Sequence, residues 1–212
     1  MADDDFGLEK VPQGAHGAME TAGHVPVLLK QAIEFLAVRR GGTFIDATLG
    51  LGGHSLEIAR RLGPQGHLIG FDKDPQALEL ARKRLTQAAE THGGWPAVTL
   101  LQGSNAEIGK RVPAASADGV LADLGMSSLQ LGDAARGFSF QAEGPLDMRM
   151  DPHEERTADQ VVNHIGEEDL ANVIYEFGEE RRSRRIARAI VRARPIRNTA
   201  HLAQVISAAL RP

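Results

Sequence analysis

The residues with the clearest chemical meaning form a glycine-rich turn. Gly50, Gly52 and Gly53 lie where a short apolar stretch typical of a strand gives way to a helical pattern. Glycines at such a turn permit a positive φ and let a ligand approach the bare backbone, and the helix start that follows offers free N–H groups to an acceptor. The turn is therefore a candidate ligand site, although the glycines alone are also compatible with a tight turn that binds nothing.

An acidic residue, Asp72, ends the next apolar stretch. It follows Gly50 by about 20 residues, the spacing at which a carboxylate binds the two ribose hydroxyls of a nucleoside cofactor. The dinucleotide fingerprint Gly-x-Gly-x-x-Gly/Ala is not met, because its sixth position is Ser55, and Asp46 precedes the turn where methyltransferases keep an acid. The pattern favours S-adenosylmethionine over NAD. Asp74 is expected to begin the following helix.

A third acid, Asp123, lies at the end of a further apolar stretch. Because ligands of an open parallel sheet gather at the carboxyl ends of its strands, we expect Asp123 to face the same crevice as Gly52 and Asp72. Its carboxylate is a candidate acceptor for an amino group. The alternative is a structural carboxylate tied to the N–H groups of the neighbouring loop, and one residue can do both.

The elements that must position these residues alternate between strand and helix patterns, which predicts an α/β fold with a parallel sheet. Four strands joined by such crossovers should pair in the order 3-2-1-4. We expect strands at 43–47, 67–71, 98–101 and 119–124, and helices at 27–38, 54–62, 75–89 and 106–110.

The rest of the chain has a different pattern. Residues 1–22 lack apolar periodicity and are expected to form a mobile tail, and 23–128 form the cofactor-binding domain. Residues 129–212 form a helical domain without strands, with helices in 157–180 and 183–210 that are separated by Gly166, Gly178 and Pro195. Charge is sorted within it: 151–180 hold ten acids and one arginine, whereas 181–212 hold nine arginines and no acid.

Composition narrows the class of protein. With 42% hydrophobic residues, 25% charged residues and a net charge of −4, the chain matches an ordinary globular protein. The absence of cysteine excludes disulfides, thiolate metal sites and a cysteine nucleophile within these 212 residues, and we expect no metal. No apolar run approaches the roughly 18 residues of a membrane span, and the first 20 residues lack a signal-peptide pattern, so a cytoplasmic location is expected.

Five motifs occur in a fixed order: Gly-x-Gly-Gly-His at 50–54, Asp-Leu-Gly-x-Ser-Ser-x-Gln-Leu at 123–131, Arg-Gly-Phe-Ser-Phe at 136–140, Gly-Pro-Leu-Asp-Met-Arg-Met-Asp at 144–151 and Gly-Glu-Glu-Arg at 178–181. Together they closely resemble the RsmH (MraW) family of bacterial 16S rRNA cytosine-N4 methyltransferases. The resemblance covers about residues 24–210. It implies a class I methyltransferase, Rossmann-like fold with an inserted helical domain.

The resemblance also implies a function: methylation of a cytidine amino group in the decoding centre of the small ribosomal subunit, with 16S rRNA as partner. Cofactor contacts carried over from the family are Gly52, Gly53, His54, Asp72, Asp123 and Gln130. The family usually has an aromatic residue after the third strand, and Asn105 stands there in this sequence. His54 is expected to make a backbone contact at the helix start rather than to act as a base. A homodimer is possible.

The exocyclic amine of cytosine is the favoured target. Methylation at the ring carbon commonly needs a thiolate, and this sequence contains no cysteine. Asp123 or the nearby backbone is the expected proton acceptor. Phe138 and Phe140 either stack on an extruded cytosine or pack the helical domain against the sheet. The arginines from Arg181 to Arg197 either neutralise RNA phosphates or form a solvated face partly paired with the acids of 167–180.

The family completes its sheet with further strands, and this chain ends at Pro212 without them. We therefore expect most of the cofactor pocket to be present but turnover to be slow. The alternative function is that of a catalytically incomplete fragment that binds RNA or the ribosome. A nicotinamide-dependent oxidoreductase is a third, weaker option.

Overall fold

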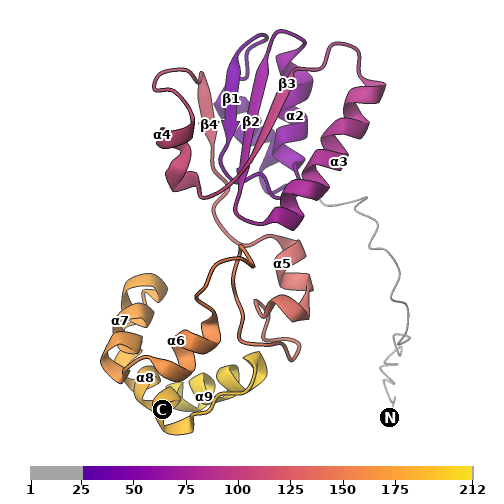
Figure 1. Cartoon of the computed structure of the whole chain (residues 1–212). Helices are drawn as coiled ribbons and strands as arrows, with labels where there is room; N and C mark the ends of the chain where they lie inside the picture. Colours follow the sequence, from indigo (N-terminus) through magenta and orange to yellow (C-terminus); the bar gives the residue numbers. More distant parts are fainter. Residues whose placement is uncertain (1–25, 212) are drawn as a thin grey trace, which may run out of the picture.

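The computed structural model describes residues 26–211. The predicted tail, 1–22, lies outside the described residues. In the described part, an α/β unit with a parallel sheet is followed by a helical unit, and the segment between them carries a short helix, α5 (Figure 1). The fold class expected from the alternating pattern is thus confirmed.

The sheet contains four parallel strands in the order β3-β2-β1-β4, as predicted. They are β1 (Thr43–Asp46), β2 (His67–Asp72), β3 (Ala97–Gln102) and β4 (Gly119–Leu121). In the register, Asp46 at the end of β1 lies beside Gly70 on β2 and Leu121 on β4. The residues that follow the carboxyl ends of β1, β2 and β4 are therefore brought to one edge of the sheet.

One predicted boundary is wrong, because β4 ends at Leu121 and not at Leu124. Its neighbour β1 ends at Asp46, and the last ladder contact is the hydrogen bond from Ala47 N–H to the Leu121 carbonyl, 2.8 Å. Beyond it, the Asp123 N–H donates to the Thr48 side chain, so the backbone leaves the sheet to join the glycine turn. Other predicted bounds agree with the structure to within about two residues.

Alternate strand residues build cores on the two faces of the sheet. Phe44 and Leu68 pack with helices α1 (Leu29–Leu36), α2 (Gly53–Leu62) and α3 (Pro75–Thr91). Ile45 and Ile69 point the other way, to a smaller cluster beside the 3-10 turn η1 (Asn105–Glu107) and helix α4 (Ile108–Arg111). Both faces are covered, as expected for a parallel sheet.

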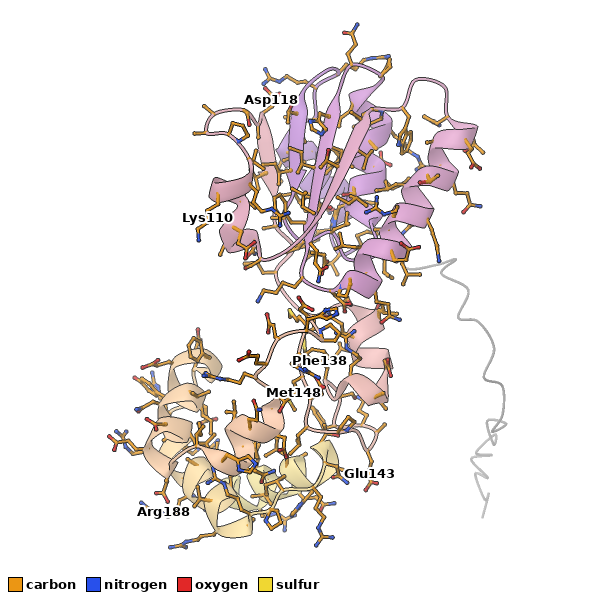
Figure 2. The ribbon with its side chains drawn as sticks, viewed as in Figure 1. Lys110, Asp118, Phe138, Glu143, Met148 and Arg188 are labelled. Carbon is orange, nitrogen blue, oxygen red and sulfur yellow. The ribbon has the colours of Figure 1, made fainter. Side chains whose placement is uncertain are left out.

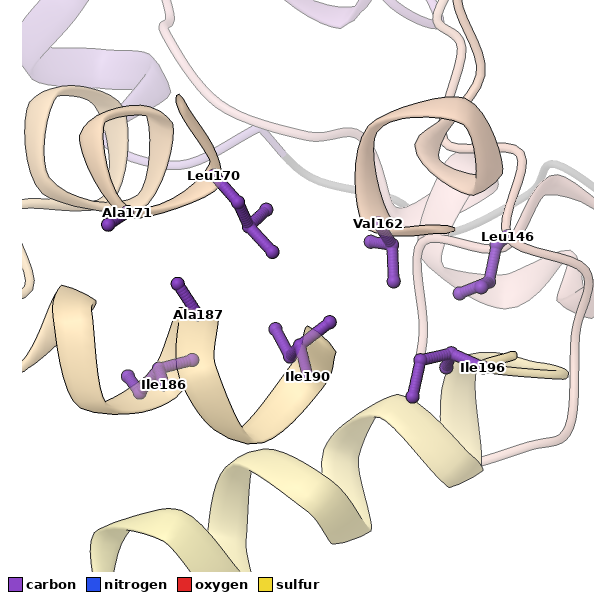
Figure 3. Packing of buried hydrophobic residues seen from close by; sticks show 8 residues of the cluster. All are labelled: Leu146, Val162, Leu170, Ala171, Ile186, Ala187, Ile190 and Ile196. Carbon is purple, nitrogen blue, oxygen red and sulfur yellow. The ribbon is translucent and has the colours of Figure 1, made fainter. Parts of the chain in front are cut away.

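The helical unit has its own hydrophobic core. After α5 (Ser128–Gly132) and the turn η2 (Ala134–Arg136), it consists of α6 (Ala158–His164), α7 (Glu167–Gly178), α8 (Ser183–Ala193) and α9 (Thr199–Leu210). The breaks expected at Gly166 and Pro195 fall between these helices, and Gly178 is the last residue of α7. Figure 3 shows side chains of α7 facing those of α8, with Val162, Leu146 and Ile196 extending the cluster. Within residues 26–211, no helix combines the length and apolarity that crossing a membrane requires.

Candidate functional site

The glycine turn connects β1 to α2 with two residues in the left-handed region. Gly50 has φ +51° and Gly52 has φ +74°, a conformation that disfavours a Cβ. A Cβ on Gly52 would also lie 3.2 Å from the Cβ of Ala81 on α3, and one on Gly53 would collide with the ring of Pro26. Glycine at 52 lets α2 begin close to α3, and glycine at 53 makes room for the segment before α1.

A buried carboxylate at the end of β1, Asp46, holds this turn in place through hydrogen bonds. It is fully buried and accepts hydrogen bonds from the Thr48 N–H at 3.2 Å and from the Ser55 hydroxyl at 2.7 Å. Burial raises the pKa of Asp46, while the hydrogen bonds from Ser55 and Thr48 oppose the rise. Asp46 therefore has a structural part in the site: it fixes both ends of the turn.

The acid at the end of β2, Asp72, is hydrogen-bonded to the same turn. Its Oδ2 accepts a hydrogen bond from the Gly50 N–H at 2.7 Å, and its Oδ1 accepts one from the Asp74 N–H at 2.9 Å. Burial raises the pKa of Asp72 against the effect of these hydrogen bonds. A carboxylate has about four acceptor sites, so two remain for the hydroxyls of a ligand.

The acid after β4, Asp123, approaches from the other side of the glycine turn. Its backbone N–H donates to Thr48 Oγ1 at 2.7 Å, and its carboxylate, about half exposed, lies 3.9 Å from Nδ1 of His54. No hydrogen bond from a loop N–H to this carboxylate occurs among residues 26–211, so the structural alternative weighed for Asp123 has no support there. His54 is buried, and its Nε2 lacks a hydrogen-bond partner within the same range.

The expected start of α3 at Asp74 is confirmed, since its side chain accepts from the Gln76 N–H at 3.0 Å. Gln130 is also engaged in the structure. Its amide donates to Asp74 at 3.2 Å, and its carbonyl oxygen accepts from the Ser127 N–H in a capping box that begins α5. Gln130 therefore reaches the site with its side chain already held by protein groups.

These groups surround a cavity of about 410 Å³ at the carboxyl edge of the sheet. That volume lies in the usual range for small-molecule sites, roughly 300 to 1,000 Å³. Seven of the residues singled out in the sequence line the cavity: Gly50, Gly53, His54, Asp72, Asn105, Asp123 and Gln130. Gly52 is not among the lining residues, because its position against Ala81 serves the packing of α2 on α3.

Several lining residues were not anticipated. Thr48, Lys73, Met126 and Met150 all face the cavity. Thr48 carries a sequence signal in hindsight, as a hydroxyl two residues beyond the buried Asp46. Met150 belongs to the motif at 144–151, but no local pattern predicts that it reaches the cavity, because it does so only through the course of the segment after η2.

The two phenylalanines of the Arg-Gly-Phe-Ser-Phe motif differ in their surroundings. Phe138 is half-buried, with the guanidinium of Arg136 5.8 Å from its ring centre, a cation–π arrangement. Phe140 is 72% exposed. Figure 2 places Phe138 in the segment between the sheet and the helical unit. Phe140 thus remains available to a partner, whereas Phe138 belongs to the junction.

The arginines near α8 divide into two groups. Arg184, Arg188 and Arg192 are exposed on α8, a helix whose opposite side buries Ile186 and other apolar residues, and Arg181 is exposed just before this helix. Pairing with the preceding acids is partial, as in Arg188 with Glu167 at 3.4 Å and Arg182 with Glu180 at 3.5 Å. Arg188 points outward from the helical unit (Figure 2).

Arg194 is different. It donates to the carbonyls of Val162 and Ile165, both at 2.8 Å, and so satisfies carbonyl groups at the end of α6. Its inclusion among the RNA-facing arginines is not supported by these contacts, because the guanidinium is already used inside the helical unit.

Comparison with known proteins identifies the family. The model of the MraW methylase family matches residues 21–212. The chain belongs to this family. Ribosomal RNA small subunit methyltransferase H of Koribacter versatilis is 67% identical over 202 residues, which is 95% of this chain and 64% of that protein. The proteins of the same name from Acidobacterium capsulatum and Solibacter usitatus are 62% and 50% identical, over 90% and 88% of this chain.

This MraW methylase chain spans a little less than two thirds of the length of these relatives, with 64% of the Koribacter protein, 65% of the Acidobacterium protein and 64% of the Solibacter protein covered. The matched part contains the whole cavity described above. It also contains all of the exposed arginines on α8.

Proposed function

We propose that this chain carries the methyl-donor site and an RNA-binding surface of an S-adenosylmethionine-dependent methyltransferase. Its substrate would be the exocyclic amino group of a cytidine in the 16S rRNA decoding centre. The observation that carries the proposal is the position of Asp123, a half-exposed carboxylate that lines the same cavity as Asp72. Family membership supports the same activity.

The residues present fit S-adenosylmethionine. Asp72 retains acceptor sites for ribose hydroxyls. Leu49 and Ala77 form an apolar part of the cavity wall. The start of α2 at Gly53 and His54 offers N–H groups, and the buried Nε2 of His54 can take a hydrogen bond. When bound, the cofactor supplies an electrophilic methyl group on a positively charged sulfur. Asn105 would lie at the place where relatives commonly have a ring, and its amide can bond to a base edge.

The protein's part in the chemistry is positioning and proton acceptance. An exocyclic amine must lose a proton as its nitrogen gains a methyl group, and the Asp123 carboxylate accepts that proton at one of its oxygens. The Thr48 hydroxyl oxygen accepts a hydrogen bond from the Asp123 N–H and so fixes the backbone position of Asp123. The 212 residues contain no cysteine, so they supply no thiolate for addition to the cytosine ring, and the amine is the favoured target.

Exposed arginines on α8 provide charge for the RNA backbone. Arg184 and Arg192 have no ion pair within the described part of the chain, and Arg188 has only the exposed contact with Glu167. Unpaired guanidinium groups on one helix face can neutralise phosphates even in a protein with net charge −4. Phe140, exposed near the junction, is a candidate for stacking on the extruded base.

A second candidate function is RNA binding without turnover. It is favoured by β4, which pairs only with β1 among the strands of residues 26–211. Because β4 is an edge strand of this sheet, the Asp123 loop that follows it has a neighbouring strand on one side only.

Two measurements separate these functions. Calorimetric titration should give binding of S-adenosylhomocysteine and none of NAD, and tight NAD binding would contradict the cofactor assignment. Incubation with labelled S-adenosylmethionine and small ribosomal subunits should transfer label to rRNA. Binding of both cofactor and RNA with no transfer over many hours would favour the second candidate.

A further inference from the structure

Asp74 receives three hydrogen bonds from three different segments. It is fully buried and lies two residues beyond Asp72. Its Oδ1 accepts from the Gln76 N–H on α3, while its Oδ2 accepts from Gln130 Nε2 at 3.2 Å and from Arg136 Nη1 at 2.8 Å. A carboxylate with no solvent contact is thus bonded to its own helix, to α5 and to η2.

The other side of the Arg136 guanidinium reaches the segment that leads into the helical unit. Nη2 donates to the carbonyl of Arg149 at 3.0 Å and to that of Met150 at 2.9 Å. Met150 lines the cavity, as does Gln130. One half-buried guanidinium therefore joins the start of α3 to the wall of the cavity.

Two more contacts bridge the same junction, but both are exposed. Lys73 lies 3.7 Å from Glu154, and the Gln102 amide donates to Asp151 at 3.1 Å. The exposed ion pair contributes little because solvent and salt screen it. The exposed hydrogen bond of Gln102 competes with water and adds little as well. The bond between Asp74 and Arg136, with side chains 0% and 14% exposed, is the one in which a charge would be left buried if its partner were removed.

We propose that Arg136 is a positioning residue that couples occupancy of the cofactor cavity to the placement of the helical unit. The proposal rests on the function proposed above in taking a nucleoside ligand at Asp72. Asp72 Oδ1 accepts from the Asp74 N–H, so the turn that holds the ligand also holds the carboxylate that binds Arg136. Ligand at Asp72 steadies this turn, and the steadied turn fixes Arg136 and the carbonyls of 149 and 150. RNA held by the helical unit is thereby placed relative to the methyl donor.

The test compares Arg136→Lys with Glu154→Gln in the 212-residue chain. Lysine keeps a positive charge for Asp74 but lacks the fork that reaches the two carbonyls at the same time. Glu154→Gln removes an exposed bridge across the same junction and is the matched control. Hydrogen exchange of residues 145–165 is measured with and without S-adenosylhomocysteine, together with its dissociation constant and the melting temperature of each free variant.

For the parent and for Glu154→Gln, ligand should slow exchange across 145–165. For Arg136→Lys, this protection should be lost and the dissociation constant should rise about tenfold, a typical size for coupling between sites. A purely structural role would lower the melting temperature of Arg136→Lys but leave the dissociation constant and the ligand-induced protection as in the parent, and that result overturns the proposal.

Failure of the cofactor assignment gives a different pattern. If the parent binds no S-adenosylhomocysteine, the proposed function is wrong, and exchange in the free proteins decides the role of Arg136. Faster exchange of 145–151 in Arg136→Lys than in Glu154→Gln would support its positioning of that segment. Equal exchange would overturn it.

Discussion

The Gly50 N–H donates a hydrogen bond of 2.7 Å to the Asp72 carboxylate, so the turn after β1 and the acid at the end of β2 form one continuous wall of the cavity. The same carboxylate accepts from the Asp74 N–H. Any change at Asp72 therefore acts on the ligand directly and also on the loop that surrounds it.

Asp72→Ala should weaken binding of S-adenosylhomocysteine by roughly 1.5 to 3 kcal/mol, the size of lost charge-assisted hydrogen bonds. Asp72→Asn keeps the volume and one acceptor oxygen, and should weaken it less. Isothermal calorimetry on the three proteins measures the effect. A dissociation constant unchanged in Asp72→Ala would remove this residue from the site.

The buried Asp46 predicts a pH dependence of stability. Burial raises its pKa in the folded protein above the ordinary 3.8, so the folded state holds the proton more tightly than the unfolded state. The raised pKa of Asp46 therefore stabilises the folded protein fully below pH 3.8, and this stabilisation is lost as the pH rises through the pKa of the folded state. Asp46→Asn does not titrate. Denaturant unfolding should show the variant gaining stability relative to the parent between acidic and neutral pH, and a difference independent of pH would contradict this.

Gly52→Ala should lower the free energy of unfolding by about 1 to 2 kcal/mol, because alanine at φ +74° is strained and its Cβ would press on Ala81. Gly109→Ala is the matched control, since a Cβ at this position in α4 meets open space. Alanine there should be neutral or slightly stabilising. Urea unfolding of both variants provides the comparison, and equal stabilities would show that the turn tolerates a side chain at 52.

Reversing two arginines on α8, Arg184→Glu with Arg188→Glu, should weaken binding to small-subunit rRNA and flatten its dependence on salt. Cofactor affinity should stay close to that of the parent. Arg60→Glu with Arg61→Glu makes the same change of charge at exposed positions on α2, on the sheet unit. If both double variants show the salt slope of the parent, the arginines of α8 form only a solvated face.

Much of the sheet unit could be predicted because its signals are local. Strand patterns, the glycines and the spacing to Asp72 together give the strand order and the placement of Asp72 on the cavity. The end of β4 could not be predicted, because it depends on where its neighbour β1 stops and on the contact of Asp123 with Thr48. Other contacts between residues far apart in the sequence could not be predicted for the same reason.

Two residues illustrate this limit. In the sequence, Arg194 is indistinguishable from the other arginines of the basic segment. In the structure, tertiary packing brings it to the carbonyls at the end of α6, to which it donates. Asp74 reads as a helix cap, which it is, while its bond to Arg136 joins residues far apart in the chain. Composition and spacing describe the local role of each residue but not its distant partner.

Mass mapping of the methylated nucleoside is the most direct test of the central claim, that Asp123 serves methylation of a cytidine amine. Small ribosomal subunits that lack the modification are incubated with S-adenosylmethionine and either the parent chain or Asp123→Asn, after confirming that both bind S-adenosylhomocysteine. The parent should place a methyl group on the exocyclic nitrogen of a decoding-centre cytidine, and Asp123→Asn should do so at least about 100-fold more slowly, the usual contribution of a positioned base. A methyl group on a ring carbon, or equal rates for the two proteins, would contradict it.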